Sequence, residues 1–148
     1  MTTSIHRSFR TIFSGSVLTL LATALLLTSC ATREKFVTST VVPAAVGEVK
    51  VKKDDNNNYR VEISVENLAE PNRLPVPKSV YVAWAQTGGG SPQNLGQVRS
   101  SSGLFSSKLK AELKTVTAYK PSRIFITAED VPTATYPSSY VILNTNSF

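Results

Sequence analysis

The chain has 148 residues, with 16 Lys and Arg against 10 Asp and Glu, one cysteine and one histidine. This length allows one ordinary domain at most, and a targeting segment reduces what remains for it. The only histidine is His6 and the only cysteine is Cys30. The chain beyond them therefore cannot form a disulfide, a thiolate metal site or a Ser–His or Cys–His catalytic pair from its own side chains.

Residues 1–29 have the organisation of a secretory signal peptide. Arg7 and Arg10 give the first residues a positive charge, and no acidic residue accompanies them. An uncharged, leucine-rich run follows at 17–27, about half of the roughly 20 residues that a membrane-spanning helix needs. Small residues then lead to Cys30. This order predicts cleavage between Ser29 and Cys30.

The tetrapeptide Leu27-Thr28-Ser29-Cys30 resembles the bacterial lipobox, in which a lipid-modified cysteine becomes the first mature residue. The resemblance implies acyl chains on Cys30, whose thiolate is the nucleophile for diacylglyceryl transfer. Each buried lipid CH₂ contributes roughly 0.8 kcal/mol, so two or three chains anchor a protein firmly. Ala31 follows the cysteine, which in enterobacterial lipoproteins implies the outer rather than the inner membrane. The alternative is an ordinary signal peptide, or an uncleaved anchor, with a chance thiol.

Beyond the signal, 14 Lys and Arg face 10 Asp and Glu, because Arg7 and Arg10 leave with it. The excess is scattered, which favours a weak attraction to anionic lipid head groups and disfavours a nucleic-acid partner. Residues 30–43 are predicted to be the lipidated cysteine and a flexible tether, with a possible edge strand at 38–42. The folded domain is expected at 44–148.

From residue 44 the apolar side chains recur at every second position. Val49 and Val51 alternate with charged residues, and so do the apolar residues of 59–65. This is the pattern of strands with one buried and one wet face. The short polar residues of 54–58 suit a turn, so the two runs are predicted to form an antiparallel hairpin.

The remaining chain predicts further strands separated by loops. Three prolines make 67–79 a crossing loop, and the run 80–85, apolar on both faces, predicts a central strand. The other expected strands are 94–98, 103–105, the ambiguous stretch 106–117, 122–129 and 140–143. We therefore expect an all-β domain, a small immunoglobulin-like antiparallel β-sandwich of about seven strands.

Several loose motifs in 47–143 are similar to those of the extracytoplasmic C-terminal domain of anti-sigma-K-type factors. They are Asn67-Leu68, Tyr81-Val82-Ala83-Trp84, Asn94-Leu95-Gly96, Gly103-Leu104-Phe105 and Ile126-Thr127-Ala128-Glu129-Asp130-Val131-Pro132. The resemblance implies a β-sandwich outside the cytoplasm. The chain departs from the family because it has only about 16 residues before its apolar run and no His-Cys-Cys zinc motif, so sigma-factor binding does not carry over.

We expect no metal, cofactor or catalytic residue. The oxygen-rich stretch 54–58 lacks the spacing of a calcium loop, and the serines have no histidine partner. Paired catalytic carboxylates need a defined separation, whereas Glu129 and Asp130 are neighbours that point apart on a strand. The other acidic candidates are Glu66 and Glu112. Structural or solvated roles are favoured for all of them.

Loops at the ends of a sandwich are the expected contact surfaces. The candidates are Gly88-Gly89-Gly90, the proline-rich loop 67–79 and the loop 131–139 with Tyr136. Trp84 is expected in the core. The favoured function is a non-enzymatic envelope lipoprotein whose domain binds or supports another envelope component. The alternative is a glycan-binding module, with Tyr136, Tyr140 or Phe148 as exposed aromatic residues.

Overall fold

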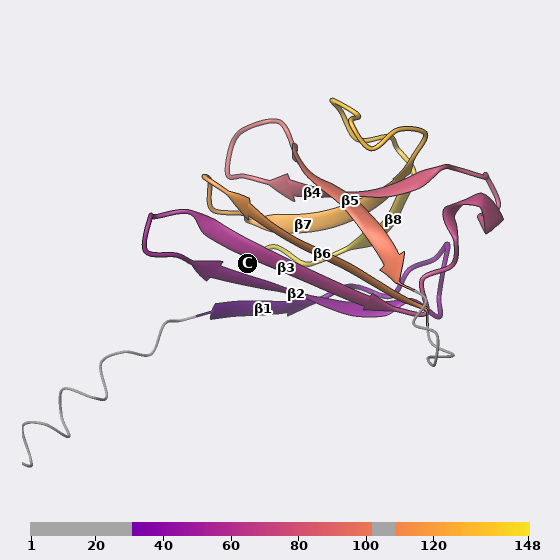
Figure 1. Cartoon of the computed structure of the whole chain (residues 1–148), viewed down its shortest axis with the longest axis horizontal. Coiled ribbons are helices and arrows are strands. Elements are labelled where there is room, and N and C mark those ends of the chain that lie inside the picture. Colours follow the sequence, from indigo (N-terminus) through magenta and orange to yellow (C-terminus); the bar gives the residue numbers. More distant parts are fainter. Residues whose placement is uncertain (1–30, 102–108) are drawn as a thin grey trace, which may run out of the picture.

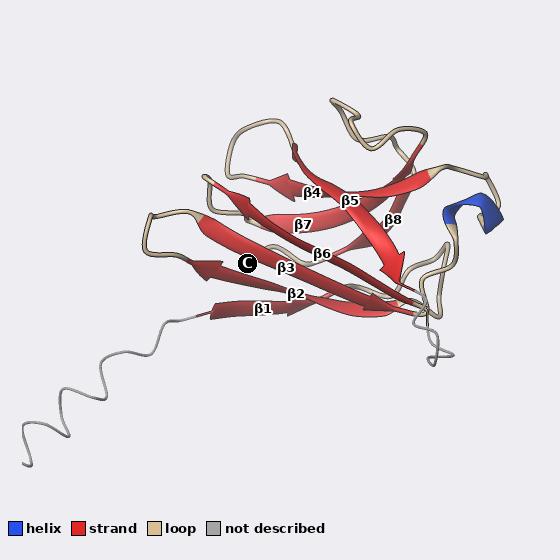
Figure 2. Cartoon of the chain, viewed as in Figure 1, coloured by secondary structure: helices blue, strands red, loops and turns tan. Residues whose placement is uncertain are grey.

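The computed structural model describes residues 31–101 and 109–148, and in them the chain is all-β (Figures 1 and 2). These residues form eight antiparallel strands and one short 3₁₀ helix, where the sequence predicted about seven strands. The elements are β1 (Ala31–Lys35), β2 (Val46–Lys53), β3 (Tyr59–Glu66), η1 (Pro71–Arg73), β4 (Val80–Gln86), β5 (Gln93–Ser101), β6 (Lys110–Thr117), β7 (Arg123–Glu129) and β8 (Val141–Asn144).

The strands form one curled sheet in the order β1-β2-β3-β6-β5-β4-β7-β8. Strand β5 joins the two halves, because its first part pairs with β4 and residues 99–101 pair with β6. The curl also brings the two outermost strands together. Phe36 forms a bridge with Thr145, and the Val37 amide donates to the Asn144 carbonyl at 2.8 Å. Figure 1 shows the two halves as stacked layers.

The core fills the space between the two layers. The residues that face it from one layer are buried members of β2, β3 and β6, and those from the other belong mainly to β4, β7 and β8. Alternation every two residues gives each strand this inward face, and the hydrophobic effect stabilises the packed layers. Representative members are Val49, Val61, Ile63, Ala83, Ile124, Ile126 and Leu143.

The hairpin of β2 and β3 confirms the prediction from alternation. Val51 lies opposite Val61, and outward-facing Lys50 lies opposite Glu62 with 3.9 Å between their charged atoms. In the turn, the Asp54 carboxylate accepts hydrogen bonds from two backbone amides of 56–58, both at 2.9 Å. This oxygen therefore stabilises the turn, as is usual for aspartate in tight loops. No group of three possible metal-ligating acidic, histidine or cysteine side chains occurs in the two described ranges.

The other predicted strands and loops are found close to their expected places. The loop 67–79 crosses between β3 and β4 and contains η1, and β4 lies between β5 and β7. The ambiguous stretch 106–117 is a strand from Lys110 onward. The expected segment 103–105 lies outside the described residues.

The expected flexible tether at 30–43 needs correction for its described part. Residues 31–35 form β1, which pairs with β2 over five residue pairs from Ala31–Lys52 to Lys35–Glu48. Residues 38–42 contain a bend at 40–41 instead of the expected edge strand, and the Ser39 hydroxyl accepts from the amide of Val42 at 3.0 Å. The folded unit thus includes residues 31–35, because β1 satisfies backbone groups that β2 leaves unpaired.

Gly47 is required where β2 passes β3. A Cβ on Gly47 would collide with the Ser64 carbonyl oxygen and lie 2.9 Å from Val65 Cα. We expect Gly47→Ala to lower the free energy of unfolding by about 1–3 kcal/mol, the usual cost of overpacking, measured by urea denaturation. Gly89→Ala is the matched control, because a Cβ there meets nothing within 4 Å. Equal stability of the two variants would contradict this account.

Candidate functional site

The predicted contact loops lie at different places on the molecule. Gly88-Gly89-Gly90 belongs to the loop between β4 and β5, whereas Tyr136 belongs to the loop between β7 and β8. The proline-rich loop 67–79 joins the opposite end of β4. Tyr136 is 71% exposed. The structure brings the glycine loop beside Tyr119, which was not among the predicted contact residues.

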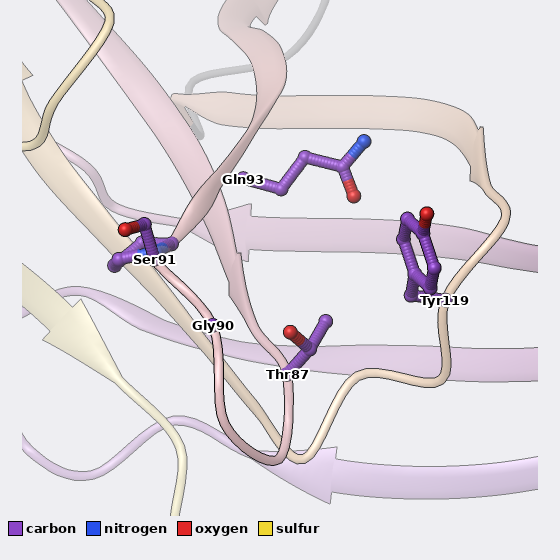
Figure 3. A pocket seen from close by; sticks show the side chains of 6 residues that line it. Thr87, Gly90, Ser91, Gln93 and Tyr119 are labelled. Carbon is purple, nitrogen blue, oxygen red and sulfur yellow. The ribbon is translucent and has the colours of Figure 1, made fainter.

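A hollow of about 550 Å³ opens between the β4–β5 loop and the β6–β7 loop. Figure 3 shows the Gln93 side chain extending toward the ring of Tyr119. Tyr119 is 67% exposed. The remaining lining residues are Thr87, Gly90, Ser91 and Pro92. An exposed aromatic face beside amide and hydroxyl groups suits a polar ligand with an apolar side.

Two hydrogen bonds hold the walls of this hollow. The Gln86 amide nitrogen donates to the Gly90 carbonyl at 2.8 Å, which fixes the glycine loop on β4. The Thr117 hydroxyl donates to the Gln93 Oε1 at 2.8 Å, which joins the end of β6 to the start of β5. The Lys120-Pro121 that follows Tyr119 could have predicted that Tyr119 lies in a turn. Its proximity to Gln93 and the glycine loop could not be predicted, because it depends on how the strands pair.

The hollow lies at the end of the sheet where the described chain begins. Ala31 is opposite Lys52, which precedes the hairpin turn 54–58. Strand β6 ends at the same end of the sheet, because its last residue, Thr117, lies opposite Tyr59, the first residue of β3. In Figure 1 the start of β1, the hairpin turn, the β4–β5 loop and the β6–β7 loop all lie at the left. We call this the N-terminal end of the sheet.

Trp84 is fully buried, as expected, but it lies outside the main core cluster. It shares the outward face of β4 and β7 with Phe125, and their rings stack with centroids 6.5 Å apart. The indole Nε1 donates to the Thr127 hydroxyl at 2.8 Å. A loop adds to the burial of this face, because the Asn94 amide donates to the Pro132 carbonyl (3.1 Å) and to the Ala134 carbonyl (2.9 Å).

The adjacent carboxylates point apart, as expected on a strand. Glu129 is 6% exposed, and its Oε1 accepts from the Thr127 hydroxyl at 2.5 Å and from the Ser138 amide at 2.8 Å. Asp130 is exposed and pairs with the Lys78 ammonium at 2.8 Å. Glu129 therefore fastens the loop 131–139 to β7. Glu66 and Glu112 lie on β3 and β6, on the outward face of the other layer.

Tyr81 anchors the crossing loop from the inner side. Its hydroxyl donates to the Ala69 carbonyl at 2.8 Å, which supplies the polar partner that a buried phenol needs. Burial, with a smaller contribution from Tyr140, raises the pKa of Tyr81 to about 12. The phenol therefore stays neutral and acts as a structural donor.

Ser29 and Cys30, the predicted cleavage and lipid-attachment residues, lie outside the described residues. Across 31–101 and 109–148 no helix has the length and apolar character needed to cross a membrane.

Comparison of the chain with protein-family models, with curated proteins and with solved structures finds no match. The similarity of its loose motifs to the anti-sigma-K-type domain therefore stays a prediction.

The hydrogen bonds from Trp84 to Thr127 and from Thr127 to Glu129 allow the stability of the outward face of β4 and β7 to be tested. We expect Thr127→Val to lower the free energy of unfolding by about 1–3 kcal/mol, because buried Trp84 loses its acceptor and Glu129 loses a donor. Urea denaturation followed by tryptophan fluorescence measures this. Thr32→Val, at an exposed position of β1, is the control for the same exchange in a strand. A loss of stability no larger than the control's would contradict the structural role.

Proposed function

We propose that the chain is a lipid-anchored bacterial envelope lipoprotein whose β domain has a binding or structural role and no catalytic one. The observation that carries the proposal is the lipobox-like Leu27-Thr28-Ser29-Cys30 after a basic start and a short apolar run. The first described strand, β1, begins at the next residue, Ala31. Cleavage before Cys30 would thus leave an intact domain directly attached to the lipid.

The contacts of three acidic side chains support structural roles for them and not catalytic ones. Buried Glu129 holds a loop, Asp54 stabilises a turn and Asp130 pairs with Lys78. Glycosidase-type chemistry needs two carboxylates that face each other across a cleft, and these three are engaged in separate structural contacts.

The position of the anchor supports an assignment for the partner-binding side. Cys30 adjoins the N-terminal end of the sheet, so the loops at the other end point away from the membrane. These are the proline-rich loop 67–79 and the loop 131–139 with exposed Tyr136 (Figure 1). We propose that another envelope component binds there, with the outer membrane favoured over the inner one because Ala31 follows the cysteine.

The test compares the wild-type chain with Cys30→Ala after expression in a bacterium. We expect the wild type to lose residues 1–29, gain the mass of a diacylglyceryl group or more, and fractionate with membranes. The variant gains no lipid mass, because it lacks the thiol that is acylated. Intact-protein mass spectrometry and membrane fractionation measure both changes.

Ser29→Ala is the control, because it keeps both the thiol and a small residue at the cleavage point. It should be processed and lipidated as the wild type is. A wild type that keeps its N-terminus, or is released without lipid, would overturn the proposal.

A glycan-binding module is the second candidate, and the hollow beside Tyr119 favours it. An exposed aromatic ring next to Gln93 and Thr87 offers stacking and hydrogen bonding to a sugar. It ranks second because the hollow opens at the end that the anchor holds against the membrane.

For this candidate we expect Tyr119→Ala to weaken binding of N-acetylhexosamine oligomers about tenfold, the equivalent of about 1.4 kcal/mol of stacking. Calorimetric titration measures it. Tyr136→Ala is the matched control, because Tyr136 is equally exposed and distant in the fold. Absence of saturable binding to the wild type would remove this candidate.

A further inference from the structure

Some Lys and Arg side chains of the described residues are paired with a carboxylate and others are not. Five of them lie within 4.0 Å of a carboxylate, and most of these pairs are at mid-sheet or at the end away from Ala31. The other eight, which include Lys35, Arg99, Lys114 and Arg123, have no carboxylate within that distance among residues 31–101 and 109–148. The rest of the eight are Lys52, Lys53, Arg60 and Lys120. All four are exposed.

These four cations gather at the N-terminal end of the sheet. Across neighbouring strands Ala31 lies opposite Lys52, Lys52 opposite Arg60, and Arg60 opposite Val116. One residue further along β2, Lys53 lies opposite Tyr59, at the start of β3. We call the set Lys52, Lys53, Arg60, Val116, Tyr119 and Lys120 the basic face.

Two exposed apolar side chains accompany the charges. Val116 is 52% exposed and Tyr119 is 67% exposed. Tyrosine is enriched where a membrane meets water, because its ring is apolar and its hydroxyl stays hydrated. The acidic residues at this end are Asp54 and Asp55, and Asp54 already accepts two backbone hydrogen bonds of its turn. Four cations against these two carboxylates leave the basic face with a net positive charge.

We infer that the basic face binds the anionic phospholipid surface of the membrane that carries the anchor, and so fixes the orientation of the domain. This inference rests on the proposed lipidation of Cys30. One peptide bond joins Cys30 to Ala31, the first residue of β1. The anchor therefore keeps Lys52 and Arg60 close to the head groups, where each Lys or Arg is attracted by the negative surface potential.

Attachment of the domain to the membrane through Cys30 allows a surface of low affinity to stay bound to the head groups. Once the acyl chains are inserted, the second contact is intramolecular, and a short connection gives it a high effective concentration. Four cations and a tyrosine that bind weakly from solution are then sufficient to hold one end of the sheet down. The hollow beside Tyr119 would face the head groups in this orientation.

The test uses the lipidated protein reconstituted into vesicles of phosphatidylcholine with or without phosphatidylglycerol. A new cysteine at exposed Ala118 carries a fluorophore, and acylated Cys30 does not react with the label. Val76→Cys, in the loop 67–79, is the matched control at the other end. Quenching by a head-group nitroxide lipid is measured for both labels.

With phosphatidylglycerol we expect about threefold stronger quenching at position 118 than at position 76, and a smaller contrast in high salt, because the attraction is electrostatic. Equal quenching of the two labels would overturn the inference while mass spectrometry still shows lipid on Cys30. Absence of that lipid would overturn the proposed function and this inference together.

Two charge-reversal variants distinguish an effect of the basic face from an effect of the net charge of the domain. Lys52→Glu with Lys53→Glu should reduce the contrast between the labels to its value in phosphatidylcholine alone. Lys35→Glu with Arg99→Glu changes the net charge equally on exposed residues outside the basic face, and should leave the contrast unchanged. Equal loss in both double variants would show that overall charge alone orients the domain, and would overturn the assignment to this face.

Discussion

The fold depends on the bend of β5, because this strand belongs to both layers of the curled sheet. It pairs with β4 before the bend and with β6 after it. Gly96 lies in the part that pairs with β4 and has a φ of 119°, a conformation that side-chain-bearing residues rarely adopt. The Asn94 side chain accepts from the Gly96 amide at 2.8 Å, and the pairing with β4 shifts register between Ala83 and Trp84. Such an irregularity increases local twist and lets one sheet enclose its own core.

The two layers differ on their outward faces: one is buried and the other is exposed and charged. The face of β4 and β7 buries Trp84 and Thr127, with the loop 131–139 fastened at its edge. The face of β2, β3 and β6 is exposed and carries rows of alternating charges, including the pair Lys50–Glu62. One layer is thus thickened by a second small apolar cluster, whereas the other presents charge to its surroundings.

Most strands were predictable, because alternation or a continuous apolar run records burial directly in the sequence. Strand β1 was missed because its residues Ala31–Lys35 are mostly polar, and it is a strand only through pairing with β2. The glycine loop was predictable from composition. Its neighbour Tyr119 was not, because their proximity depends on the register of β6 and on the Thr117–Gln93 hydrogen bond. Trp84 was correctly expected to be buried, but not on an outward face.

The pairing of β1 also has a mechanical consequence. A lipid anchor at Cys30 and a partner held at the opposite end of the sheet would pull along the axis of β1. The five residue pairs between β1 and β2 would then be loaded in shear, so their hydrogen bonds would have to break together instead of one at a time. The contact of Phe36 with Thr145 would pass part of this load to β8, on the other edge of the sheet. Tension between membrane and partner would therefore be carried by the sheet as a whole.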